Sequence, residues 1–196
     1  MKKTFLPLLA LSAGALLGLA GCSTDAHYVD PAGSRAVTEV GRINVQDFAN
    51  AADTMVNSLI DSIISQDKLK SGAPGEPALM AISRVQNSTG QQFDTDQLVK
   101  KIRIQLLKTG KVQTSTTISL GETEDPLAKE QQAAQGNTRP ADYTLSGKII
   151  EDRAQSGKLR QSAFIFQLSL SSRAGVAIWE EEKTIIKQGT RPSVGF

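Results

Sequence analysis

Apolar residues recur every three or four positions in two stretches of the chain, and this spacing predicts two amphipathic helices. The first extends from about Asp47 to Ser65 and the second from about Thr95 to Thr109. Asp94 or Thr95 is expected to cap the second helix, and Gly110 can adopt the left-handed conformation that ends it. The residues expected on the inner faces are Phe48, Ala52, Met55, Val56, Leu59 and Ile63 in the first helix, and Leu98, Ile102 and Leu106 in the second.

Beyond Tyr143 the pattern changes to alternation of apolar and polar residues, which predicts three strands. Turn-forming residues at 155–158 and 172–175 separate these strands, and the last one runs from Val176 to Ile186. Strands joined by short turns form an antiparallel meander with one face packed on the helices. The clearest alternation places four apolar residues on one face, namely Phe164, Phe166, Leu168 and Leu170.

Three weaker signals complete the order of elements. The apolar run from Leu79 to Val85 and the loose alternation from Val112 to Thr117 predict two more strands. Asp125 followed by a proline predicts a polar surface helix that ends at about Gln135. The whole pattern predicts an α+β domain in two layers, with an antiparallel or mixed sheet of about 4–5 strands flanked by about 3–4 helices.

Residues 1–21 are typical of a bacterial signal peptide, because a short basic start precedes an apolar run too short to span a bilayer. The segment Leu19-Ala20-Gly21-Cys22 resembles a lipobox, where the peptide is cut before the cysteine and acyl chains such as palmitate are attached to it. We therefore expect lipidation at Cys22, which anchors the protein in a membrane. Ser23 follows where Asp would favour the inner membrane in enteric lipoproteins, so we expect sorting to the outer membrane.

Residues 22–40 show no periodicity and are expected to form a flexible tether that contains His27 and Tyr28 as solvated side chains. The tether spans at most ~65 Å when fully extended. As a flexible coil it averages ~25 Å. It joins a globular domain at residues 41–188, with an expected diameter of ~40 Å, and residues 189–196 are expected to be a loose tail.

Composition narrows the possible chemistry. With one Cys and one His the chain lacks the ligands of a zinc site and the partners of a nucleophile–histidine mechanism, so we expect no cofactor and no metal. The net charge of +2 disappears when Lys2 and Lys3 leave with the signal peptide. Phosphate neutralisation, and with it nucleic-acid binding, is therefore not expected. We also expect no small-molecule substrate.

Several charged or aromatic residues could belong to a site, and each has a simpler interpretation. Asp94 and Asp96 are typical of a helix start, Trp179 is expected in the core, and Arg103 and Arg153 are expected on the solvated surface. On a strand, Glu180 and Glu182 share one face and Glu181 lies on the other. Two carboxylates could cleave a glycosidic bond, but a solvated strand explains this cluster better.

Five blocks of the sequence together resemble the penicillin-binding-protein activator LpoB family, over roughly Ile43 to Lys187. They are Ile82–Thr89, Phe93–Lys111, Tyr143–Ile149, Phe166–Leu170 and Ile178–Lys187. The resemblance implies a fold like the N-terminal domain of TolB, an antiparallel sheet flanked by helices. It also implies an outer-membrane lipoprotein that faces the periplasm, binds a bifunctional class A penicillin-binding protein and stimulates peptidoglycan synthesis. The activator would not be an enzyme.

Two other functions are compatible with the sequence. A lipoprotein of the same fold could serve another envelope machine, such as a secretion or polysaccharide export complex. A peptidoglycan-cleaving enzyme that uses Glu180 or Glu182 is the third hypothesis. In the activator hypothesis the tether is short compared with the long linker of enteric members, so reaching an inner-membrane synthase requires a nearly extended tether, a tall partner or a narrow periplasm.

Overall fold

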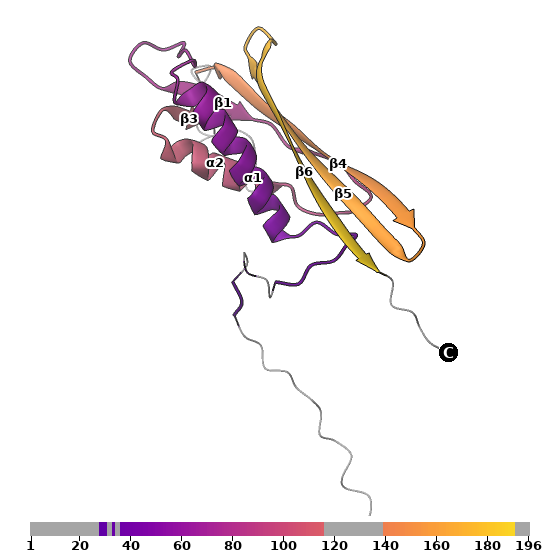
Figure 1. The fold of residues 1–196 in the computed structure, drawn as a ribbon. Helices are drawn as coiled ribbons and strands as arrows, with labels where there is room; N and C mark the ends of the chain where they lie inside the picture. The colour runs from indigo at the N-terminus through magenta and orange to yellow at the C-terminus, as the bar shows by residue number, and fades with distance from the viewer. Residues whose placement is uncertain (1–27, 31–32, 34–35, 116–138, 191–196) are drawn as a thin grey trace, which may run out of the picture.

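The computed structural model of the 196-residue chain describes residues 28–30, 33, 36–115 and 139–190. These residues form two layers, with helices α1 (Val45–Leu59) and α2 (Asp96–Lys108) on one face of a six-stranded sheet (Figure 1). The strands are β1 (Ala78–Ile82), β2 (Gln86–Ser88), β3 (Val112–Thr114), β4 (Tyr143–Ser156), β5 (Leu159–Ser172) and β6 (Ala177–Thr190). The α+β class is confirmed, whereas the helix expected at 125–135 lies outside the described residues.

Helix α1 begins with a capping box. The side chain of Asn44 accepts a hydrogen bond from the backbone N–H of Asp47 at 3.1 Å, and the Asp47 carboxylate accepts one from the N–H of Asn44 at 2.7 Å. This exchange satisfies two N–H groups that a helix start leaves free. Every residue expected on the inner face of this helix is buried, which confirms the predicted apolar stripe.

The last turn of the first helix widens into a short π-helix, Ile60–Ile64, in which the N–H of Ser65 donates to the carbonyl of Ile60 at 2.7 Å. The wider turn brings the consecutive residues Ile63 and Ile64 into the core together. Burial of both apolar side chains accounts for this departure from α geometry. Such π-helical turns are rare in proteins.

Helix α2 matches its prediction closely. Asp94 Oδ1 accepts a hydrogen bond from the N–H of Asp96 at 2.8 Å, so Asp94 supplies the expected acceptor at the helix start. Gly110 follows the helix with a φ of +67°, the left-handed conformation expected of it. Leu98, Ile102 and Leu106 are at most 1% exposed.

The sheet has the order β3-β1-β4-β5-β6, with β2 also paired to β4. The last three strands pair antiparallel, as the predicted meander requires. The pairs β1–β3, β1–β4 and β2–β4 are parallel, so the sheet is mixed rather than antiparallel throughout. Helix α2 lies between β1 and β3 in the chain, and such a crossover returns the second strand in the same direction as the first.

Strands β4, β5 and β6 each contain 14 residues and extend beyond the helices toward the β4–β5 turn (Figure 1). Gly157 makes that turn with a φ of +57°, and Gly175 makes the next one with a φ of +77°. Strand β6 continues to Thr190 and pairs there with Leu159, two residues past the expected end of the domain at 188. Strand β2 was not predicted, because its three residues are all exposed.

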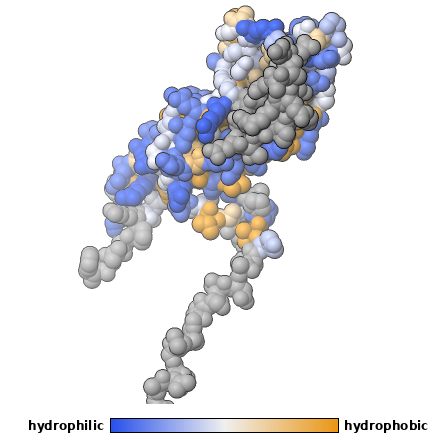
Figure 2. All heavy atoms as spheres, turned by 180° about the vertical axis from the view of Figure 1, so that it is seen from behind, coloured by the Kyte–Doolittle hydropathy of each residue, from blue (hydrophilic) through white to orange (hydrophobic). Residues whose placement is uncertain are grey.

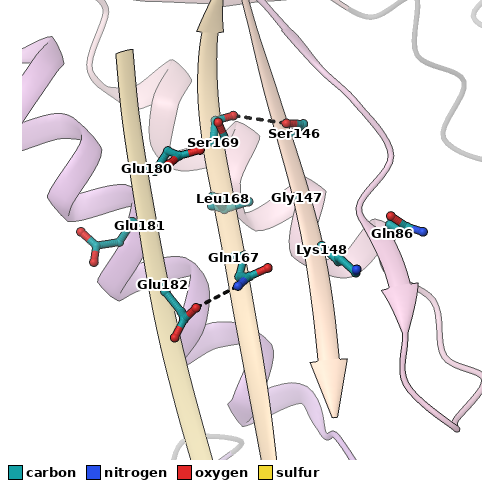
Figure 3. Close-up of a pocket in the computed structure, with 10 residues that line it drawn as sticks. All are labelled: Gln86, Ser146, Gly147, Lys148, Gln167, Leu168, Ser169, Glu180, Glu181 and Glu182. Atoms are coloured by element: carbon teal, nitrogen blue, oxygen red, sulfur yellow. Dashed lines mark hydrogen bonds between the residues drawn. The ribbon is translucent and has the colours of Figure 1, made fainter. Parts of the chain in front are cut away.

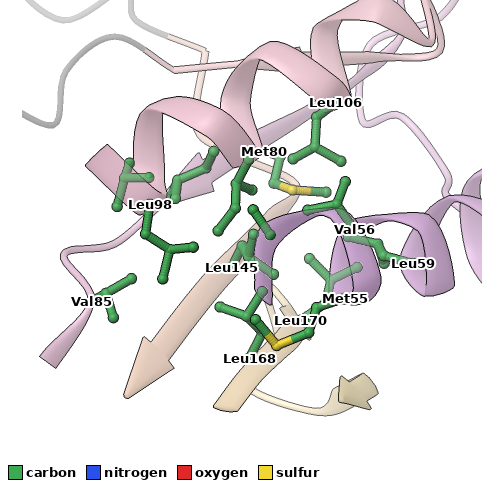
Figure 4. Close-up of a cluster of buried hydrophobic side chains, with 14 of the residues drawn as sticks. Met55, Val56, Leu59, Met80, Val85, Leu98, Leu106, Leu145, Leu168 and Leu170 are labelled. Atoms are coloured by element: carbon green, nitrogen blue, oxygen red, sulfur yellow. The ribbon is translucent and has the colours of Figure 1, made fainter. Parts of the chain in front are cut away.

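The core lies between the helices and the near face of the sheet (Figure 4). Phe48 of α1 meets the ring of Phe166 edge-on, with the ring centroids 6.1 Å apart. Glycine at position 147 lets the side chains of Leu168 and Val85 pack against the backbone of β4. A Cβ there would stand 2.7 Å from Leu168 Cδ2 and 3.2 Å from Val85 Cγ2. No helix in the described part of the chain is long and apolar enough to cross a membrane.

Candidate interaction surface

The sheet presents one face to the helices and leaves the other open. Side chains alternate between the two faces along each strand. Along β5, the residues that alternate with the buried Phe164, Phe166 and Leu168 point to the open face. On the three long strands the central residues of this open face are Ser146, Lys148, Ile150, Ile165, Gln167, Ser169, Glu180, Glu182 and Thr184.

Strand register arranges these residues in rows that cross the sheet. Lys148, Gln167 and Glu182 are direct neighbours on β4, β5 and β6, and Gln167 Nε2 donates to Glu182 Oε2 at 2.9 Å. Figure 3 shows this row with the helices behind the sheet. We call Lys148, Gln167 and Glu182 the charged row, and Gln86 of β2 continues this row beyond Lys148.

The rows on either side of the charged row are less charged. One contains Ser146, Ser169 and Glu180, and the other contains Ile150, Ile165 and Thr184. An open hollow of about 620 Å³ lies over the charged row and over the row of Ser146, Ser169 and Glu180. The hollow is therefore a surface that can contact another molecule rather than an enclosed pocket.

The glutamate cluster divides between the two faces as expected. Glu180 and Glu182 are exposed on the open face. Glu181 turns toward α1, where its carboxylate accepts a hydrogen bond from Ser58 Oγ at 2.5 Å. Trp179 also lies on the helix side and is 9% exposed, so its predicted place in the core is confirmed.

Arg103 lies in a different place from the one predicted. Its side chain was expected on the solvated surface, but the residue is 8% exposed, and Nε and Nη2 of its guanidinium have no hydrogen-bond partner in the part of the chain that the structure describes. The sequence could not show this, because Arg103 follows the inward-facing Ile102 and lies at the border of the apolar stripe. A buried donor without a partner lowers the free energy of unfolding.

Arg153 is exposed, as predicted, and its Nε lies 2.6 Å from Glu151 Oε1. Burial alone would raise the pKa of the Glu151 carboxyl, but hydrogen bonds from Arg153 and from the N–H of Gly90 outweigh it and hold this pKa below its usual range. The pair fixes the loop after β2 against β4. The role of the Arg153–Glu151 pair is therefore structural.

Asp142 forms the main polar anchor at the end of the domain where β4 begins. Its carboxylate accepts hydrogen bonds from the backbone N–H groups of Leu79 at 2.9 Å and Gly72 at 3.0 Å, and Arg139 lies 2.5 Å away. Burial would raise the pKa of Asp142, but these donors and the Arg139 charge outweigh it and lower this pKa. Arg173 also approaches Asp142, at 3.4 Å.

The opposite end of the long strands receives the N-terminal segment. Val40 lies against Gly189, since a Cβ on this glycine would stand 2.5 Å from Val40 Cγ2. Lys187 Nζ donates to the carbonyl of Arg42 at 2.7 Å and contacts the carboxylate of Asp47. The expected tether therefore joins the domain beside the end of β6, at the same end as the β4–β5 turn (Figure 1).

The remaining predicted residues are placed as follows. Tyr28 is fully exposed, in agreement with its interpretation as a solvated residue. Cys22, Ser23 and His27 lie outside the described residues. Within the residues that the structure describes, no group of three His, Cys, Asp or Glu side chains could hold a metal ion. On the face of the molecule in Figure 2, hydrophilic side chains predominate among the described residues.

Comparisons with known proteins give one family. The model of the family described as peptidoglycan-synthase activator LpoB matches residues 47–185. This range covers nearly all of both helices and of the sheet. No curated protein matches the chain significantly.

Several solved structures are similar to the chain at low identity. The LpoB C-terminal domain from Escherichia coli is 16% identical, with a TM-score of 0.44, over 71% of this chain and 98% of that one. The lipoprotein GNA1162 from Neisseria meningitidis is 12% identical, with a TM-score of 0.37, over 57% of this chain and 84% of that one. The PelC dodecamer from Paraburkholderia phytofirmans is 19% identical, with a TM-score of 0.32, over 62% and 80% respectively.

Proposed function

The chain belongs to the peptidoglycan-synthase activator LpoB family, and from this premise we propose that it binds a bifunctional class A penicillin-binding protein and stimulates it. The match over residues 47–185 is the observation that carries the proposal. In this role the protein is a regulator of peptidoglycan synthesis and performs no chemistry itself. It holds a membrane anchor at Cys22, a tether at 22–40 and a domain at 41–188 that contacts the synthase.

Activation of this kind requires a difference in affinity. The regulator must bind an active conformation of the synthase more tightly than an idle one, since a ligand with equal affinity for both shifts nothing. Coupling free energies between two binding events are typically ~1–3 kcal/mol, which corresponds to about 5- to 150-fold. We expect the affinity of the regulator for the active conformation of the synthase to exceed its affinity for the idle one by a factor within this range.

The position of the tether supports the proposed reach. The tether joins the domain beside Gly189, at one end of strands that contain 14 residues each. A strand of this length spans about 46 Å. With a tether of at most ~65 Å, the end of the domain that contains Asp142 can stand up to roughly 110 Å from the membrane. That distal end is therefore the surface best placed to meet a synthase rooted in the opposite membrane.

The function is tested with the lipidated protein purified in detergent and each class A penicillin-binding protein of its host. Glycan polymerisation and peptide cross-linking are followed with lipid II as the substrate. We expect at least one synthase to bind at micromolar concentration or below and to accelerate about fivefold or more. Absence of binding to every class A synthase would contradict the proposal, and so would release of muropeptides from sacculi by the protein alone.

The anchor and its sorting are tested in cells. We expect radiolabelled palmitate to be incorporated into the wild-type protein and not into the variant Cys22→Ser, which should leave the membrane fraction. The variant Ser23→Asp keeps the acylated cysteine and changes only the sorting residue. We expect it to be labelled normally but to move from the outer to the inner membrane fraction. An unlabelled wild-type protein would contradict the anchor, and an unmoved Ser23→Asp variant would contradict the sorting role.

A further inference from the structure

The open face of the sheet carries an unusual distribution of charge. Lys148, Glu180 and Glu182 are exposed there, and none of them makes an ion pair with another described residue. The acidic side chains lie on β6, which is the edge strand, and Lys148 lies two strands away on β4. About 9.6 Å separates the backbones of alternate strands, and among the described residues this cation and these carboxylates stay unpaired.

The order of charges in the charged row is self-complementary. We propose that the open face pairs two copies of the chain about a two-fold axis that runs parallel to β5. Rotation about this axis exchanges the left and right sides of the face and keeps each row at the same height. Lys148 of one copy then lies over Glu182 of the second copy, and the same pair forms a second time across the axis.

Neighbouring rows fit the same arrangement. Ser146 faces Glu180 of the second copy, where a hydroxyl can donate to a carboxylate. Ile165 and Gln167 lie on the axis and face their own counterparts, which places an apolar contact at the centre. The small Ser169 permits close approach in the next row. The contact is therefore isologous, as two-fold interfaces are, with apolar and neutral groups at the centre and charged pairs at the rim.

The orientation of the pair is fixed by the charges. A two-fold axis perpendicular to the strands would place Lys148 over Lys148 and Glu182 over Glu182, which is repulsive. Packed sheets cross at about 30°. Rows far from the centre of the contact are therefore displaced from the matching rows of the second copy. The twist moves the outer row with Asp152 and Ile186 out of the contact, which leaves three rows across three strands as the interface.

The size of this interface predicts its strength. Three strands and three rows cover about 300 Å² of sheet, given strand spacings of about 4.8 Å and about 6.8 Å between residues on one face. Stable interfaces bury about 800 Å² on each partner. Pairing in dilute solution is therefore weak. Anchors in one membrane raise the effective concentration of the two copies, so pairing is favoured at the membrane surface.

The test uses the full lipidated chain in liposomes. Gln167→Cys places a thiol on the axis and Thr54→Cys places one on the exposed surface of α1, away from the open face. We expect a short bismaleimide to join two copies through position 167 and not through position 54. Failure to cross-link through position 167 at a lipid-to-protein ratio where position 54 is equally accessible to a monofunctional maleimide would overturn the proposal.

Charge reversal adds a test of orientation. In the Gln167→Cys background, Lys148→Glu and Glu182→Lys should each lower cross-linking about tenfold, since two attractive pairs become repulsive. A one-to-one mixture of these two variants should recover it, because each then meets an opposite charge. Lys158→Glu on the β4–β5 turn is the matched control and should have no effect.

Two results would overturn the pairing arrangement. One is failure of the mixture to recover cross-linking while both variants keep the thermal midpoint of the wild type. The other is a wild-type protein that stays monomeric in liposomes while Lys148→Glu lowers its binding to a synthase. In that second case the open face would belong to the synthase contact, and the proposed function would stand without the pairing.

Discussion

Lys187 Nζ and Asp47 Oδ2 lie 2.5 Å apart, which joins the last strand of the domain to the cap of its first helix. The two side chains are 11% and 6% exposed, and 140 residues of chain separate them. The same Asp47 carboxylate accepts the N–H of Asn44 in the capping box. One carboxylate therefore holds the helix start, the end of β6 and the point where the tether enters the domain.

Replacing Lys187 with methionine should lower the free energy of unfolding by about 3 kcal/mol, because the Asp47 charge stays buried without its partner. Lys183→Met is the matched control on the same strand and the same face, where the lysine makes no ion pair with the described residues. We expect the control to change stability by less than about 0.5 kcal/mol. Urea unfolding measures both, and equal losses would contradict a specific role for Lys187.

Asp142 should make the stability of the domain sensitive to acid. Its pKa is lowered in the folded state, so its contribution is complete above the unfolded value of about 3.9 and is lost as the pH falls through the folded value. Asp142→Asn should therefore destabilise the domain at pH 7. The difference in the free energy of unfolding between the variant and the wild type should disappear as the pH falls below about 4.

The measurement is the urea midpoint across a pH series. Glu76→Gln is the control, because Glu76 also pairs with Arg139 but is 57% exposed. It should shift the midpoint little at any pH, since exposed ion pairs contribute about 0–1 kcal/mol. A gap for Asp142→Asn that persists unchanged down to pH 2 would show that the carboxylate charge is not responsible.

Gly147→Ala should destabilise the domain by about 1–3 kcal/mol, because the new methyl group would crowd Leu168 Cδ2 at 2.7 Å and the carbonyl of Gln167 at 3.1 Å. The backbone carbonyl cannot move away without disturbing the β4–β5 ladder. Gly41→Ala is the control, since its added Cβ would meet nothing within 4 Å. Thermal unfolding followed by circular dichroism distinguishes the two, and equal midpoints would contradict the close approach.

Arg103→Met should stabilise the domain by about 1 kcal/mol. The substitution removes a buried guanidinium, two nitrogens of which have no partner among the described residues, and puts an unbranched apolar side chain in its place. Arg160→Met removes an exposed arginine from β5 and should leave the free energy of unfolding within about 0.5 kcal/mol of the wild type. A clear loss of stability in Arg103→Met would show that the guanidinium is held by an attractive interaction.

Periodicity in the sequence was sufficient to predict the elements that bury one face. The apolar stripe of α1 and the alternation through Phe164 to Leu170 both specify burial directly, and the structure confirms both. Short or polar elements gave no such signal. Strand β2 has three exposed residues, and the π-helix at Ile60–Ile64 arises from packing rather than from a local pattern.

The candidate surface could be predicted only in part. The alternation of Glu180, Glu181 and Glu182 between two faces followed from the strand period, but their alignment with Lys148 depends on the register of three strands. A slip of one residue in register would move a strand's side chains to the opposite face. The contacts of Asp142 depend likewise on how loops distant in sequence meet, which no single-sequence pattern encodes.

The contact of Val40 with Gly189 brings the point where the chain enters the domain next to the point where it leaves. A fluorescent reporter fused after Phe196 would therefore be held at the end of the domain where the chain enters it, away from the end that contains Asp142. In the proposed arrangement at the outer membrane, energy transfer from a dye in that membrane to this reporter would report tether extension in living cells and would leave the end that contains Asp142 unmodified.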